Sequence, residues 1–116
     1  MKKLISLLLI SLTLNALNLT PKNFNKTLSK HKIVVVEYWA PWCVPCSVLG
    51  PEFNRASKEL KKEVLMAKYN VDLGGVREKG IDTIPTIVIY KNGKEVSRKT
   101  EILSAEAIVE WVKSYE

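Results

Sequence analysis

The two cysteines of the chain, Cys43 and Cys46, are separated by Val44 and Pro45. They follow Ile33–Trp39, an apolar run rich in β-branched residues that has the pattern of a strand buried on both faces. If a helix begins at Cys43, both sulfurs share one of its faces and can close a small disulfide ring. The unpaired N–H groups and the positive dipole end of that helix would favour a thiolate at Cys43. The spacing therefore predicts thiol–disulfide chemistry, with Cys43 as the nucleophile.

Two other uses of the cysteine pair compete with redox chemistry. A closed zinc site needs four ligands, but the chain has a single histidine, His31, and no second cysteine pair. A purely structural disulfide would suit an exported protein, yet a ring this short removes little entropy from the unfolded chain. Redox catalysis is therefore the favoured interpretation, and no metal site is predicted.

The rest of the sequence predicts alternating strands and helices in one domain. Besides the strand Ile33–Trp39, the pattern indicates a helix opening at Thr20-Pro21, a helix from Cys43 to Leu60, a strand Val64–Val71, at most a short helix within 74–80, a hairpin of Thr86–Tyr90 and Glu95–Thr100 around Asn92-Gly93, and a helix capped by Ser104. This order of elements predicts an α/β fold with a mixed sheet. A chain of 116 residues has no room for a second domain.

The first residues have the composition of an export signal. Two lysines precede the apolar run Leu4–Leu14, which is too short to span a bilayer as a helix. Cleavage after Ala16 would release a mature domain, but the cleavage site is imperfect, so an uncleaved anchor remains the alternative. We therefore divide the chain into residues 1–16, a signal peptide or N-terminal anchor, and residues 17–116, the functional domain. We expect the protein to be exported.

The charge distribution argues against a nucleic-acid partner. The formal net charge is +6, and the lysines are interspersed with acids, as in residues 58–63. Such a mixture is typical of a solvated surface. We expect a monomer that does not bind nucleic acid.

The segment Val36–Cys46, followed by Pro51, resembles the active-site region of the thioredoxin family. The likeness continues in Ala67–Asp72, Ile84–Thr86 and Lys91–Gly93, so it covers roughly residues 17–116. The resemblance implies a thioredoxin-like fold, in which helices flank a central mixed sheet and residues 17–19 form a short first strand. It also implies a thiol–disulfide oxidoreductase whose redox group is a disulfide between the two cysteines, with no metal or organic cofactor.

The resemblance assigns Glu37 and Lys68 to proton transfer. Glu37 interrupts the apolar strand, where an unpaired carboxylate would be costly. It is the counterpart of a buried acid, commonly Asp in the family, that exchanges a proton with the second cysteine, which is Cys46 in this chain. Lys68 is its natural charge partner. A surface ion pair at the sheet edge is the alternative for Glu37.

Trp42, Ile84 and Pro85 are assigned to substrate binding. Trp42, like Trp39, is expected to pack beside the sulfurs. A cis peptide bond before Pro85 would leave the Ile84 backbone free to pair with an extended client segment, whereas a trans proline at a strand start is the alternative. Glu101 stands where related thioredoxins often carry a glycine on their docking surface, which predicts a different choice of partners.

Together these residues predict a protein-disulfide reductase. Cys43 would attack a disulfide of a protein substrate, and Cys46 would resolve the mixed disulfide. The Val44-Pro45 dipeptide lacks the histidine of strongly oxidising relatives, which favours reduction. Outside the cytosol, a membrane thiol transporter would have to supply the electrons. A disulfide-introducing oxidase and a thiol-dependent binding or chaperone-like module remain the alternatives.

Overall fold

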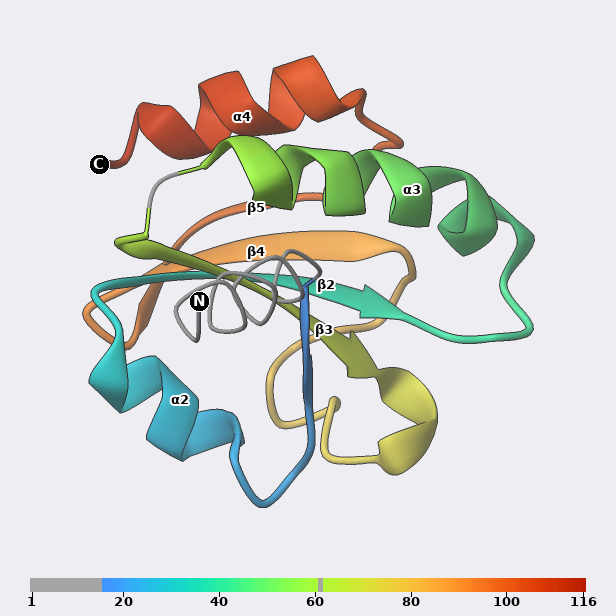
Figure 1. Ribbon diagram of the computed structural model, residues 1–116. Helices are drawn as coiled ribbons and strands as arrows, with labels where there is room; N and C mark the ends of the chain where they lie inside the picture. The colour runs from blue at the N-terminus through green and yellow to red at the C-terminus, as the bar shows by residue number, and fades with distance from the viewer. Residues whose placement is uncertain (1–15, 61) are drawn as a thin grey trace, which may run out of the picture.

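The computed structural model describes residues 16–60 and 62–116 (Figure 1). The predicted export signal, except Ala16, lies outside the described residues. In chain order, the elements are β1 (Leu17–Leu19), α2 (Phe24–Lys30), β2 (Ile33–Trp39), α3 (Val44–Glu59), β3 (Val64–Asn70), the 3₁₀ turn η1 (Val71–Leu73), β4 (Thr86–Lys91), β5 (Lys94–Lys99) and α4 (Ala105–Lys113). Within the described ranges, no helix combines the length and the apolarity needed to cross a membrane.

In the described part of the chain, five strands form one mixed sheet in the order β1-β3-β2-β4-β5. Strands β1 and β2 both pair with β3 in parallel, whereas β4 runs antiparallel to β2 and β5 runs antiparallel to β4. Helices α3 and α4 cover one face of the sheet and α2 covers the other, as Figure 1 shows above and below the strands. The predicted α/β fold with a mixed sheet is confirmed.

The central strand β2 is buried on both faces, as its continuous apolar run predicts. Ile33 and Val35 pack under α3 and α4, whereas Val34 and Val36 pack against α2. Because side chains alternate along a strand, Glu37 belongs to the same face as Ile33 and Val35. It therefore lies on the side of the sheet covered by α3, the helix that begins between the two cysteines.

Helix α2 begins at Phe24, so the predicted helix start at Thr20-Pro21 was wrong. Thr20 and Asn23 exchange hydrogen bonds instead. Asn23 Oδ1 accepts from the Thr20 N–H at 2.8 Å, and Thr20 Oγ1 accepts from the Asn23 N–H at 3.4 Å. These short polar side chains close a separate turn before the regular helix, because they compete with backbone groups for hydrogen bonds.

The other ends differ from the predicted ends by one residue. Helix α3 covers Val44–Glu59, β3 ends at Asn70, and the hairpin strands are Thr86–Lys91 and Lys94–Lys99. Strand β3 ends where Asn70 Oδ1 accepts a hydrogen bond from the Asp72 N–H at 2.9 Å, which starts η1. Residues 74–80 contain turns and no helix.

Two local predictions in the C-terminal part are confirmed. Asn92 and Gly93 both have positive φ, 54° and 82°, as a two-residue hairpin turn requires. Ser104 caps α4 by accepting a hydrogen bond from the Ala107 N–H at 3.1 Å. Both features depend on near neighbours in the chain, which explains why the sequence alone predicts them.

Candidate active site

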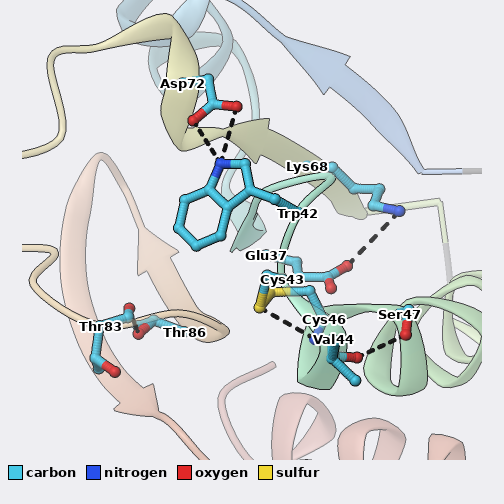
Figure 2. The surroundings of a disulfide bond; sticks show 10 residues. All are labelled: Glu37, Trp42, Cys43, Val44, Cys46, Ser47, Lys68, Asp72, Thr83 and Thr86. Carbon is cyan, nitrogen blue, oxygen red and sulfur yellow. Dashed lines mark hydrogen bonds and ion pairs between the residues drawn. A yellow bond between two sulfur atoms is a disulfide. The ribbon is translucent and has the colours of Figure 1, made fainter.

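Cys43 is the N-cap residue of α3 and forms a disulfide with Cys46 in the first turn (Figure 2). The helix begins one residue later than predicted, at Val44, so Cys43 caps the helix instead of opening it. Cys43 Sγ accepts a hydrogen bond from the Cys46 N–H at 3.3 Å. The sulfur thus takes the place of the usual capping oxygen, where free helix N–H groups stabilise negative charge.

Little of either cysteine is exposed: 7% of Cys43 and 4% of Cys46. Both pack with the buried Ala40, and the partly buried Trp39 and Ile84 flank this cluster. A client disulfide must therefore approach a narrow exposed edge, at which Cys43 is the more accessible residue. Among residues 16–60 and 62–116, no three His, Cys, Asp or Glu side chains are grouped so that they could hold a metal ion.

Glu37 is 1% exposed, so its predicted burial is confirmed and the alternative of a surface ion pair was wrong. Its partner in the parallel register is Lys68 on β3. Lys68 Nζ lies 3.9 Å from Glu37 Oε1, as the dashed line in Figure 2 marks. The same Nζ lies 5.1 Å from the centroid of the Trp39 ring. The ammonium is thus placed between a carboxylate and an aromatic face.

The Glu37 carboxylate accepts no hydrogen bond from the described residues. Burial therefore raises the pKa of Glu37 from its ordinary 4.5 to about 7, while the Lys68 ammonium acts in the opposite direction. A carboxyl group with this pKa can accept and release a proton near neutral pH. The site thus combines a helix-capping sulfur, a second cysteine and a titrating acid on the adjoining sheet face.

Trp42 is 66% exposed, and Asp72 holds its indole ring. Trp42 Nε1 donates to both carboxylate oxygens of Asp72, at 3.0 and 3.2 Å, and Figure 2 shows the ring turned toward that side chain. The contact joins the loop before α3 to η1. The sequence analysis did not reveal this bond, because no local pattern relates side chains 30 residues apart.

Trp42 and Ile84, both predicted to bind substrate, line one groove of about 200 Å³. Its other walls are Val71, Val76, Ile81, Asp82 and Thr83. Ile84 also packs against the cysteine cluster, so the groove adjoins the disulfide. The mainly apolar lining fits an apolar side chain of an extended client segment.

The Ile84–Pro85 peptide bond is cis, so the predicted isomer is confirmed and the trans alternative was wrong. Strand β4 begins at Thr86, which leaves Ile84 just outside the sheet. Thr86 Oγ1 donates to the Thr83 carbonyl at 2.6 Å across this bend. Glu101, the other departure from the family pattern, is exposed in the loop between β5 and α4.

In the reduced protein, we expect Cys43 to be alkylated before Cys46 at mildly acidic pH. The Cys46 N–H and the N-terminus of α3 stabilise a thiolate at Cys43, and the thiolate is the reactive form. Brief labelling with iodoacetamide, followed by peptide mass spectrometry, measures the order. The single variants Cys43→Ser and Cys46→Ser are matched controls. Faster labelling of Cys46 would overturn the assignment.

Glu37→Gln should make the oxidised protein more stable at alkaline pH. Below pH 4.5 Glu37 is protonated in the folded and the unfolded chain; between pH 4.5 and 7 only the folded chain keeps the proton, so wild-type stability falls as pH rises. We expect the variant to match wild type at about pH 4 and to exceed its free energy of unfolding by roughly 3 kcal/mol at about pH 8. Denaturant titration measures both values. A variant less stable than wild type at both pH values would mark Glu37 as a structural carboxylate.

Known proteins are similar in sequence to most of this chain. The family model described as Thioredoxin matches residues 15–114. A thioredoxin of Rickettsia bellii (strain RML369-C) is 33% identical over 102 residues, which cover 85% of this chain and 97% of that protein. A protein disulfide-isomerase of Oryctolagus cuniculus is 38% identical over 108 residues, which cover 85% of this chain and 21% of that protein.

Among solved structures, a single-site mutant of the thioredoxin from Halobacterium salinarum NRC-1 is similar with a TM-score of 0.79 and 22% identity, over 87% of this chain and 90% of that chain. At this identity the likeness shows the fold alone. The family model and the rickettsial relative extend to the sequence of the site. The chain therefore belongs to the thioredoxin family, and Cys43 and Cys46 are the redox pair of a thioredoxin-type thiol–disulfide oxidoreductase.

Proposed function

We propose that this protein reduces disulfides of client proteins outside the cytoplasm. The observation that carries the disulfide exchange is the buried Glu37, whose pKa of about 7 suits proton exchange with the Cys46 thiol at neutral pH. Glu37 lies on the sheet face covered by α3, and α3 contains Cys46 in its first turn.

The first step is attack by the Cys43 thiolate on a client disulfide. A bond forms between Cys43 Sγ and one client sulfur, the client S–S bond breaks, and the other client sulfur leaves as a thiolate that takes a proton from water. The position of Cys43 at the N-terminus of α3 supports its role as nucleophile, because the helix end stabilises the attacking thiolate.

The second step resolves the mixed disulfide. Cys46 gives its proton to Glu37, the Cys46 thiolate attacks Cys43 Sγ, and the client sulfur leaves as a thiolate. The protein is then left with the Cys43–Cys46 disulfide that the structure contains. Lys68 remains beside Glu37 throughout and limits the rise of its pKa, so that the acid can release the proton again.

The surroundings of Cys43 favour reduction over oxidation of clients. A strong oxidant requires its reduced form to be strongly stabilised. Among the described residues, the Cys46 N–H is the hydrogen-bond donor to Cys43 Sγ, and the exposed Val44 and Pro45 between the cysteines carry no charge. The thiolate therefore depends on the helix end alone for stabilisation within this loop.

We place client binding in the groove formed by Trp42 and Ile84. The apolar lining accepts a side chain next to the client cysteine, and the Ile84 backbone, outside the sheet, accepts an extended segment by β-addition. Asp72 fixes the Trp42 ring at the groove wall, which lowers the entropy that binding would otherwise cost.

The reduction potential tests the direction of transfer. We expect a value near that of thioredoxin, about −270 mV, whereas a value near −120 mV, known for a strong oxidant, would support a disulfide-introducing oxidase. Equilibration with dithiothreitol buffers and thiol trapping measures it. A Cys43→Ser variant that kept partner binding and full cellular function would instead favour the non-enzymatic binding or chaperone-like module.

The location outside the cytoplasm is proposed from residues 1–16, in which two lysines precede an apolar run. No soluble nicotinamide pool supplies electrons there, so we propose a membrane thiol transporter as the donor. It would reduce the Cys43–Cys46 disulfide by the same exchange in reverse.

Export is testable with a fusion of residues 1–30 to an alkaline phosphatase that is active only after export. We expect an active fusion, because the basic residues and the apolar run are the features that export machinery selects. A fusion of residues 17–30 alone is the matched control and should be inactive. Inactivity of both fusions would contradict the proposed location.

A further inference from the structure

A cavity of about 240 Å³ lies between α3 and the ends of β2 and β3, next to the disulfide. Cys46 and Lys68 line it, together with Ser47, Gly50 and Asn54 of α3. These three helical positions are spaced by three and four residues, so they share one face of the helix. A Cβ atom at Gly50 would lie 3.8 Å from Lys68 Nζ, which places the ammonium against this face, one turn from Asn54.

Two polar groups at this cavity have hydrogen-bonding capacity that the described residues do not use. Asn54 Oδ1 is buried and accepts no hydrogen bond. Lys68 Nζ can donate three hydrogen bonds, yet its contacts here are the Glu37 carboxylate at 3.9 Å and the Trp39 ring at 5.1 Å. Leaving a buried polar group unsatisfied costs about 1–3 kcal/mol. An unused acceptor and an unused donor therefore line the same space.

Water is the partner that fits both groups. The cavity of about 240 Å³ exceeds the space of one water molecule several times, and Asn54 and Lys68 in its lining provide the polar contacts that an ordered water requires. A water that donates to Asn54 Oδ1 can accept from Lys68 Nζ at the same time. Among the described residues that line the cavity, Asn54 is the one with a buried side-chain oxygen that has no hydrogen-bond partner.

We propose that Asn54 is a positioning residue of the redox centre: through water in this cavity, its amide holds the Lys68 ammonium beside Glu37 and completes the route by which a proton leaves for solvent. The proposal rests on the role proposed above for Glu37. In the resolving step, Cys46 passes its proton to Glu37, the new S–S bond forms, and Glu37 later releases that proton through the cavity water.

The residues that face Glu37 show how Asn54 can affect its proton affinity. Lys68 faces Glu37 from β3, Ile87 faces it from β4, and α3 contributes Cys46. Lys68 is thus the one cation in this set. If its ammonium drifts away, Glu37 loses the interaction that opposes the effect of burial, and its proton is bound more tightly.

Asn54→Leu tests the proposal, because leucine is similar in size to asparagine but cannot form a hydrogen bond with water. We expect the resolving step near neutral pH to slow by about fivefold, the scale of one lost hydrogen bond. The pH midpoint of that step should rise. Stopped-flow reduction of a model peptide disulfide from pH 5 to 9 measures the rates, and thermal unfolding of the same samples measures stability. Asn54→Ala replaces Asn54→Leu if leucine at this position prevents folding.

Three comparisons separate the possible results. Asn54→Ser keeps a polar group for water and should restore most of the rate, while Asn25→Leu makes the same exchange at an exposed position of α2 and should change nothing. An unchanged pH midpoint in Asn54→Leu, whether or not the melting temperature falls, would overturn the proposal. Glu37→Gln, measured in parallel, shows which proposal is wrong. If neither Glu37→Gln nor Asn54→Leu slows resolution, the proposed proton relay is wrong. If Glu37→Gln slows resolution and Asn54→Leu does not, only the role of Asn54 is wrong.

Discussion

The parallel register of β2 on β3 sets Glu37 opposite Lys68, and the redox centre depends on this pairing. A slip by one residue would turn Glu37 toward α2 and bring the bulky Tyr38 under the cysteines. Both faces of β2 are apolar, so such a slip would move every side chain of the strand out of the cluster that it fills. The packing of the core thus also affects the acidity of Glu37. The core that stabilises the sheet also buries the Glu37 carboxylate, and burial raises the pKa of that group.

Most of the fold follows from signals carried by neighbouring residues. The β-branched run of β2, the Asn92-Gly93 turn and the Ser104 cap each act within a few residues, and the structure agrees with all three. The start of α2 was predicted wrongly because Thr20 could either cap a helix or close a separate turn. Its hydroxyl and backbone form a closed turn with Asn23, and residue type alone does not distinguish this turn from a helix cap.

The sequence predicts those residues of the candidate site whose type is unusual for their position. Two cysteines at a strand-to-helix junction and a glutamate inside an apolar strand are conspicuous in the sequence. The isomer of Pro85 needed the family resemblance, since spacing carries no sign of it. The bond between Trp42 and Asp72 and the unpaired amide of Asn54 were not foreseen. Both depend on which side chains the folded chain brings together, and Asp and Asn are ordinary residues in helices and loops.

The edges of the sheet limit how a second chain can join it. Strand β1 at one edge has three residues, and β5 at the other carries Lys94, Arg98 and Lys99 beside an irregular register at Ile89 and Tyr90. Short, charged and irregular edges are poor templates for growth of a shared sheet. A protein that exchanges disulfides with partly folded chains meets exposed strands, which tend to aggregate. The edges of this sheet are therefore poor partners for the exposed strands of such chains.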